Sequence, residues 1–512
     1  MENAKSSDFA WRKVGWLCVP ALIVAAIIRI VMSRHLPLAY FNQDALGFLE
    51  TTRGLLERDE FVVNRKRTLL VPLLYWLLSV INLPIALVIP LIQHALGCVM
   101  IAMFGVMGRL LFSTWKILVV LLTLLLAIDP NLLFYEHFLM AESLFLFFIV
   151  LMVAAGAWHV IARTWLSFGA LVTSYFLAAC TRPEGRLFLL FPLVLIALLN
   201  WRKWRLLAIQ LAALGVTALV FSSLKSGNEG GLLLYTWIVH LTPDTLRSAP
   251  DFPPVIGDIK RSAADDWKKH DKRLSEMPVG WQFKKRREIL HAVGAYLGTT
   301  SLPPDEQFRA ANKFCTRVAL ETCLRRPFAV LFVGLKKGIG KIRDLTGGKL
   351  DRGVLQQKPA NALDLQPDAT KLLVGTDLRT PTEAEKFVRA HYPAQLKWFN
   401  SLYDHWRAAL NALSIPRKDW KFAGATWPPI PLFYIASIAG LLIAVEKKSP
   451  MRFWHISIGV CFLFALLLVF MTANVRGRFR FFLEPFWLLY FFVLIDFLLV
   501  KIATLRGRRT TG

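Results

Sequence analysis

The chain has 512 residues, of which 55% are hydrophobic and 12% aromatic, and its formal net charge is +26. A mean hydropathy of +0.47 and repeated long apolar runs exclude an ordinary soluble domain and predict a polytopic membrane protein. The basic residues are scattered between the apolar runs and form no recognisable nucleic-acid-binding module. They indicate anionic headgroups or a phosphate-bearing substrate as partners, and no nucleic acid.

Ten apolar runs predict membrane-spanning helices. Several are shorter than the usual span of about 20 residues, so flanking aromatic and polar residues must complete the helix. The first follows Lys5, Arg12 and Lys13 and lacks a small-residue cleavage site, so we expect it to remain as an anchor. In chain order the runs are Val14–Met32, Ile85–Met107, Ile117–Ile128, Ser143–Val160, Leu166–Ala179, Leu187–Leu199, Leu206–Leu224, Ile430–Val445, Phe453–Met471 and Phe486–Val500.

An eleventh apolar run, Leu69–Ile81, decides which loops share a side of the membrane. It is short for a span, and Pro72 and Pro84 bracket it, so we predict an interfacial helix. The basic short loops and both termini then face the cytoplasm, as the positive-inside rule requires. The predicted fold class is all-α with about ten transmembrane helices, and the absence of glycosylation sequons in the external regions favours a bacterial inner membrane.

The same assignment of loops to the two sides of the membrane divides the chain into three predicted parts. Residues 1–224 form an N-terminal transmembrane module whose loop 34–84 is external, and its stretch Asp44–Leu56 has helical apolar spacing. Residues 225–428 form a mainly helical periplasmic domain, and residues 429–512 form a C-terminal transmembrane module.

Two features of the external domain carry further predictions. We expect one helix over Gln307–Val330, which would hold Cys315 and Cys323 about 12 Å apart and therefore without a disulfide. In Pro327–Ile342, apolar residues alternate with lysines, as in a helix that lies on a lipid surface.

Asp44 stands just beyond the first span, at the start of the predicted surface helix. It suits the N-cap of that helix. It also suits a general base that accepts a proton from an acceptor hydroxyl at the membrane surface. The two interpretations are compatible.

The connector 129–142 places Asp129, Glu136, His137 and Glu142 on the same predicted face. Oxygen ligands of this kind suit a divalent cation such as Mg²⁺ or Mn²⁺. A connector with solvated charges explains the same pattern, and the spacing contains no D-x-D.

Arginines recur where later spans reach this face. Arg182 stands with Glu184 around Pro183, which predicts either a salt bridge or bidentate binding of a phosphate. Arg476, Arg478 and Arg480 depart from the positive-inside trend, so we expect an anionic partner: a lipid headgroup or a lipid-linked phosphate.

In their order and common sidedness these elements resemble the GT-C superfamily of integral-membrane glycosyltransferases, which includes the protein O-mannosyltransferases and the aminoarabinose and lipopolysaccharide-core sugar transferases. The resemblance covers roughly residues 10–225 and 430–500. It rests on Asn42–Glu50, on Asn64–Arg67 leading to Trp76, on Ala141–Phe148, on Thr181–Gly185 and on Arg478–Pro485.

The resemblance implies an inverting transfer from a polyprenyl-phosphate sugar, with Asp44 as base and Arg182, Arg478 and Arg480 as holders of the donor phosphate. Glu136, His137 and Glu142 stand nearest to the acidic metal or acceptor contacts of the superfamily's second external loop. The acceptor would be a glycolipid, cell-wall polymer or protein of the cell envelope. A transporter or flippase of lipid-linked saccharides and a membrane scaffold are the alternative classes.

Overall fold

The protein is described from a computed structural model that covers residues 2–35, 39, 47–49, 51–52, 54, 56, 68–112, 115–139, 141–223, 230–270, 281–334, 421–422, 425–426, 432–446, 451–472 and 483–509. Every predicted apolar run corresponds to a helix within the described residues. The corresponding helices are α1 (Glu2–His35), α4 (Ile85–Leu111), α5 (Lys116–Ala127), α7 (Glu142–Ala162), α8 (Trp165–Thr181), α9 (Leu190–Asn200), α10 (Trp204–Ser223), α22 (Leu432–Glu446), α23 (Arg452–Thr472) and α24 (Glu484–Arg509).

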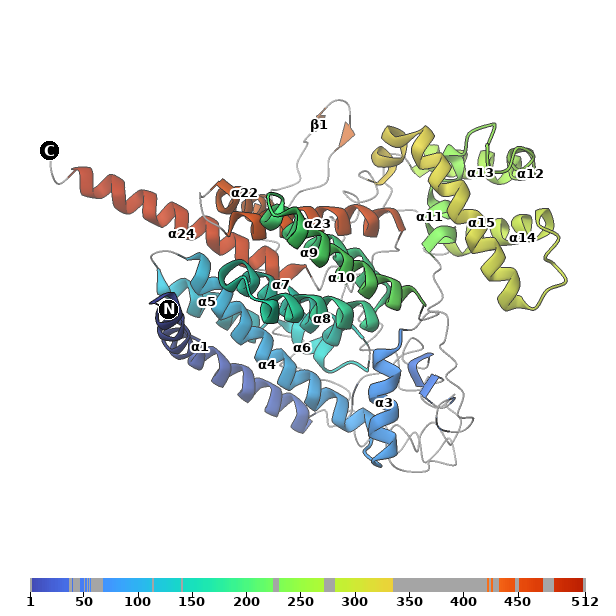
Figure 1. The fold of residues 1–512 in the computed structure, drawn as a ribbon. Helices are drawn as coiled ribbons and strands as arrows, with labels where there is room; N and C mark the ends of the chain where they lie inside the picture. The colour runs from blue at the N-terminus through green and yellow to red at the C-terminus, as the bar shows by residue number, and fades with distance from the viewer. Residues whose placement is uncertain are drawn as a thin grey trace.

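These helices pack into a bundle in which α1 begins and α24 ends toward the same side (Figure 1). Four of them are long and apolar enough to cross a membrane: Trp16–Arg34, Ile85–Leu111, Glu142–Ala162 and Glu484–Leu505. Large apolar side chains such as Ile27 and Leu219 are exposed on the outside of the bundle. Lipid tails would cover such a surface, so the chain is an integral membrane protein.

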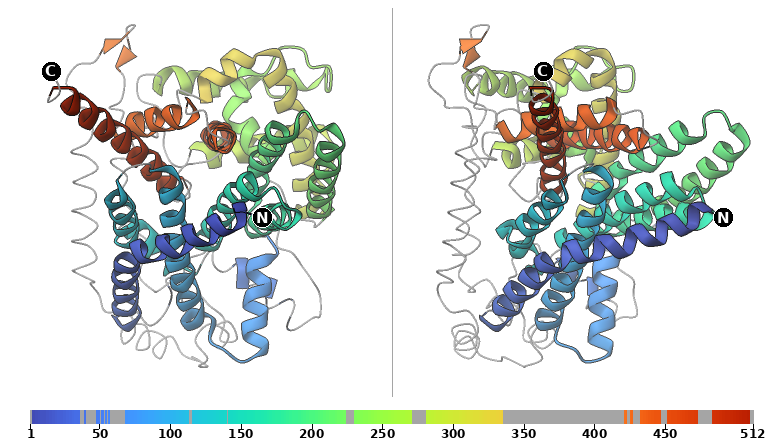
Figure 2. Two further views of the ribbon diagram at one scale, coloured as in Figure 1. Left: turned by 60° about the vertical axis from the view of Figure 1, so that its left-hand side comes forward. Right: turned by 90° about the vertical axis from the view of Figure 1, so that its left-hand side faces the viewer.

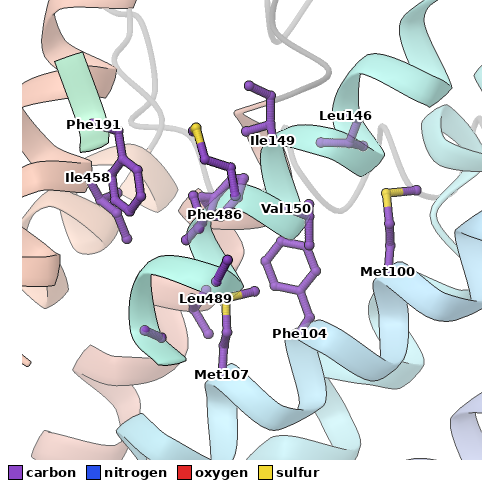
Figure 3. Close-up of a cluster of buried hydrophobic side chains, with 14 of the residues drawn as sticks. Met100, Phe104, Met107, Leu146, Ile149, Val150, Phe191, Ile458, Phe486 and Leu489 are labelled. Atoms are coloured by element: carbon purple, nitrogen blue, oxygen red, sulfur yellow. The ribbon is translucent and has the colours of Figure 1, made fainter. Parts of the chain in front are cut away.

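The interior of the bundle is an apolar core built from both ends of the chain. Phe104 of α4 meets Phe486 of α24 edge to face, with ring centroids 5.1 Å apart, and α7 supplies Leu146, Ile149 and Val150 beside them (Figure 3). Trp454 of α23 donates its indole N–H to the Val153 carbonyl of α7 at 2.8 Å. The modules that the sequence separates by the external domain therefore form one core.

The turn between α7 and α8 shows how local sequence ends one helix and begins the next. Arg163 ends α7 in the left-handed region, with φ 53°. Thr164 then caps α8, since its hydroxyl accepts the amide hydrogen of Ser167 at 3.2 Å. At the other end of α8, Pro183 begins a 3-10 turn, η1 (Pro183–Leu189), because proline cannot donate to the helix.

The predicted interfacial helix is α3 (Leu70–Val80), which lies near the end of the bundle where α4 begins (Figure 1). Its buried side chains include Val71 and Tyr75, whereas Leu77 and Val80 are exposed. Residues 47–49, 51, 52, 54 and 56 before it are also helical, as the spacing of Asp44–Leu56 predicts. Its place at a membrane surface stays a prediction.

The described part of the external domain is helical and has its own core. Its elements are α11 (Gly230–Ile238), η2 (Val239–Leu241), α12 (Phe252–Val255), α13 (Gly257–His270), α14 (Trp281–Tyr296) and α15 (Pro304–Arg325). Tyr235, Phe252, Phe314 and Val318 lie in that core, and α11 contacts α23 of the bundle (Figure 2). A small antiparallel pair, β1 (Lys421–Phe422) with β2 (Ala425–Thr426), is an addition that the sequence analysis did not foresee.

The prediction of one uninterrupted helix over Gln307–Val330 is wrong only near its C-terminal end. α15 ends at Arg325, and Arg326 adopts φ −132° and ψ 52° before a second helical stretch, 327–334. Pro327 causes the break, because a proline ring disfavours helical geometry in the residue before it. Cys315 and Cys323 both lie on α15 as free thiols, so the prediction that they form no disulfide is confirmed.

Candidate active site

A buried ion pair joins α1 to α6 (Pro130–Glu136) at the end of the bundle that leads into loop 34–84. Arg29 donates from Nε to Glu136 Oε2 at 2.8 Å and from Nη2 to Glu136 Oε1 at 2.7 Å. Its Nη1 lies 3.2 Å from the Ala25 carbonyl and 3.4 Å from the Ala127 carbonyl. Both side chains are buried, so each charge depends on the other for its stability.

Two histidines extend this pair. His94 of α4 contacts Glu136 Oε2 through Nδ1 at 2.9 Å, and its Nε2 lies 3.2 Å from His137 Nδ1. The Glu136 carboxylate fits against the helix only because residue 97 is glycine, since a Cβ atom there would overlap the carboxylate. We call Arg29, His94, Glu136 and His137 the Arg29 cluster.

A second group of charges lies where α7 begins and α8 ends. Arg182 Nη1 is 2.6 Å from Glu142 Oε1, and its Nε and Nη2 donate to the two oxygens of Glu184 at 3.1 and 3.2 Å. The side chain of Glu142 is 2% exposed, that of Arg182 12% and that of Glu184 27%, so this group opens toward solvent on the Glu184 side. We call these three residues the Arg182 cluster.

Local packing fixes the end of α8 that carries Arg182. The backbone of Gly185 approaches Ala178 so closely that a Cβ atom would overlap the Ala178 carbonyl. Thr68, just before α3, donates its hydroxyl to the Thr181 carbonyl at 2.5 Å. The C-terminal part of loop 34–84 is therefore bound directly to the residue beside Arg182.

The two clusters are connected by residues that pack beneath loop 34–84. Leu139 and Ala141 lie between Glu136 and Glu142 in the chain, and they share one apolar cluster with Phe48 and Leu49 of the loop and Tyr75 of α3. Thr52 strengthens this contact, because its hydroxyl reaches the Phe48 carbonyl at 2.9 Å and the Pro72 carbonyl at 3.3 Å. The loop residues that follow Asp44 thus lie over the connector between the clusters.

The structure brings together some of the residues that the sequence singled out. Glu136 and His137 share the Arg29 cluster, whereas Glu142 pairs with Arg182. The salt bridge between Arg182 and Glu184, one of the two interpretations offered above, is present. Asp129 is buried. Asp44, Arg476, Arg478 and Arg480 lie outside the described residues.

Sequence reasoning missed Arg29 and His94. Arg29 lies within the predicted span Val14–Met32 and His94 within Ile85–Met107, whereas the candidate site residues were all taken from span ends and loops. An ionisable side chain inside an apolar run is itself a signal of function or of a buried partner. Applied to these two residues, that rule would have pointed to the cluster.

A divalent cation does not fit the described carboxylates as they stand. Within the described ranges no group of three or more His, Cys, Asp or Glu side chains is placed to hold a metal ion. Both Glu136 oxygens contact Arg29, and Glu142 contacts Arg182. These contacts supply the counter-charges that a cation would otherwise supply.

Among solved structures, this chain is similar to a bacterial membrane protein. No protein-family model and no curated protein sequence matches. A crystal structure of ArnT from Cupriavidus metallidurans bound to undecaprenyl phosphate is similar over 89% of this chain and 77% of that chain, with 15% sequence identity and a TM-score of 0.34.

Proposed function

We propose that the chain is an inverting glycosyltransferase of a bacterial inner membrane. It would move a monosaccharide from a polyprenyl-phosphate donor to a glycolipid, cell-wall polymer or protein acceptor at the external face. Its ten apolar helices would span the membrane with both termini in the cytoplasm, and residues 225–428 would form a periplasmic domain that contributes to acceptor choice.

The observation that carries this proposal is the packing of loop 34–84 over the connector between the two clusters. Phe48 and Leu49 lie in one apolar cluster with Leu139 and Ala141. Asp44 precedes Phe48 by four residues, and an extended chain covers at most about 3.6 Å per residue. The Asp44 Cα is therefore within about 14 Å of that of Phe48, and we propose that its carboxylate faces this part of the site.

Each charged group then has a role in the transfer. The acceptor oxygen attacks the anomeric carbon of the donor, its proton passes to the Asp44 carboxylate, and the bond from that carbon to the phosphate oxygen breaks. The polyprenyl phosphate leaves with the bonding electrons. Arg478 and Arg480 are placed by sequence on the same face and would stabilise its developing charge. Attack opposite the leaving group inverts the configuration.

The structure refines the role proposed for Arg182. Two carboxylates and one guanidinium leave the Arg182 cluster with one net negative charge, and three nitrogens of Arg182 already face carboxylate oxygens. Arg182 would orient the donor phosphate, while Arg478 and Arg480 would supply most of the positive charge. Glu142 and Glu184 would hold the guanidinium plane in position.

The direct test is transfer itself. Purified protein would be incubated with a radiolabelled polyprenyl-phosphate sugar and an envelope extract, and products would be separated from the donor. We expect label in a new glycosidic bond. Donor that remains intact in every fraction would exclude the proposed activity.

A transporter or flippase of lipid-linked saccharides is the second candidate, and one observation favours it. His94 lies nine residues after the start of α4, about 14 Å along the helix, and Arg29 lies six residues before the end of α1. Ionisable groups this deep are typical of transport routes through membranes. In reconstituted vesicles a transporter would move the labelled lipid between leaflets without forming a new bond.

A further inference from the structure

A cavity of about 390 Å³ lies between α1 and α4, near the end of α1 that leads into loop 34–84. Ala26 and Ile30 of α1 and Leu91 and Ala95 of α4 provide apolar walls. Arg29, Ser33 and Arg34 line the cavity from α1, and His94 lines it from α4. The cavity wall is therefore mostly apolar, and its charged lining residues on the α1 side are Arg29 and Arg34.

The surface around the cavity is the apolar outside of the bundle. Ile23, Ile27 and Ile30 of α1 are each more than half exposed, and Leu91 of α4 is 50% exposed. Such side chains face hydrocarbon when the helices cross a membrane. A molecule that enters the cavity therefore comes from the bilayer, and its apolar part can remain on this surface.

The positive charge beside the cavity favours a lipid with an anionic headgroup. Arg29 is neutralised by Glu136, but Arg34 is exposed and forms no ion pair with a carboxylate of the described residues. Arg34 lies one residue before the end of α1 and is the last residue of the apolar span Trp16–Arg34, so a lipid headgroup would lie near it. A cation there, beside the Ser33 hydroxyl, suits a phosphate oxygen.

We propose that this cavity binds an anionic phospholipid of the surrounding bilayer. Its phosphate would contact Arg34 and Ser33, and the first part of one chain would lie between Ile30 and Leu91. At roughly 30 Å³ per water-sized group, the cavity holds about a dozen such groups. That is enough for a headgroup and the first chain carbons, while the rest of the lipid would cover the exposed isoleucines of α1. This site would take a lipid of the bilayer and no sugar donor, and so it goes beyond the proposed function.

Binding can be measured without any transfer assay. Delipidated full-length protein in detergent would be titrated with dioleoylphosphatidylglycerol or dioleoylphosphatidylcholine, and bound lipid would be counted by native mass spectrometry. We expect the anionic lipid to bind more tightly. Removal of one interfacial arginine in Arg34→Gln should weaken that binding about five-fold. Ala95→Phe, which fills the cavity from an exposed position, should abolish it.

Two matched variants control for general effects. Arg109→Gln removes an arginine at the opposite end of α4, and Val99→Phe adds a ring one turn beyond Ala95, at a residue that does not line the cavity. Both should bind the anionic lipid as the unaltered protein does. Equal binding of the two phospholipids, or equal effects of Arg34→Gln and Arg109→Gln, would overturn the proposal. So would an Arg34-dependent site that takes undecaprenyl phosphate and no phosphatidylglycerol, because the cavity would then belong to the donor lipid.

Discussion

Glu136→Gln is the substitution that tests the Arg29 cluster most sharply. It leaves the buried Arg29 guanidinium without its hydrogen-bonded countercharge, because Glu136 accepts the two hydrogen bonds that Arg29 donates to a carboxylate, at 2.7 and 2.8 Å. Removing one partner of a buried ion pair costs about 3–5 kcal/mol. The amide oxygen of glutamine can still accept one of the two bonds, so we expect a loss near the lower value, about 3 kcal/mol.

The free energy of unfolding would be measured in mixed micelles by titration with a denaturing detergent. The double variant Arg29→Met with Glu136→Gln removes the stranded charge, so it should be more stable than Glu136→Gln alone. Arg261→Gln breaks an exposed ion pair with Asp258 and should leave stability unchanged. The reasoning fails if Glu136→Gln loses less than about 1 kcal/mol, or if the double variant is less stable than the single one.

Three further predictions concern neighbouring features. Gly97→Ala should cost about 1–3 kcal/mol in unfolding measurements, since the new methyl group overlaps the Glu136 carboxylate, whereas Gly169→Ala meets nothing within 4 Å and should be neutral. Arg182→Lys should lower kcat about ten-fold at normal expression, because an ammonium cannot bind two carboxylates in one plane; unchanged kcat would remove Arg182 from the mechanism. Burial lowers the pKa of His240 to about 4. The unfolded chain therefore takes up that proton first, and stability should fall by up to about 1.4 kcal/mol per unit as pH drops from about 6.5 to 4. Titrations of the full chain should lose this component in His240→Gln.

Hydropathy predicts most of the membrane architecture of this chain. The apolar runs are long and lie between polar loops, and each of them corresponds to a helix within the described residues. The helix α3 also matches the predicted stretch Leu69–Ile81 within a residue at each end. Hydropathy cannot report side-chain contacts between distant spans, and therefore it does not reveal that α4, α7 and α24 form one core.

The clusters show where prediction from a single sequence stops. Arg182 and Glu184 are neighbours in the chain, so their ion pair is predictable from local geometry. Arg29 and Glu136 are 107 residues apart, and their pairing depends on how α1 packs against α6. The break at Arg326 could have been predicted from the sequence, because Pro327 disfavours helical backbone geometry in the residue before it.

Asp44 is proposed as the base in a transfer at this face of the membrane, and its replacement by asparagine tests that role. Purified Asp44→Asn protein would be compared with unaltered protein for transfer from a radiolabelled polyprenyl-phosphate sugar and for binding of the same donor. Asp59→Asn, the same change in the same loop, serves as the matched control. We expect Asp44→Asn to abolish transfer while donor binding and expression remain, and Asp59→Asn to transfer normally. Near-normal turnover by Asp44→Asn would contradict that role.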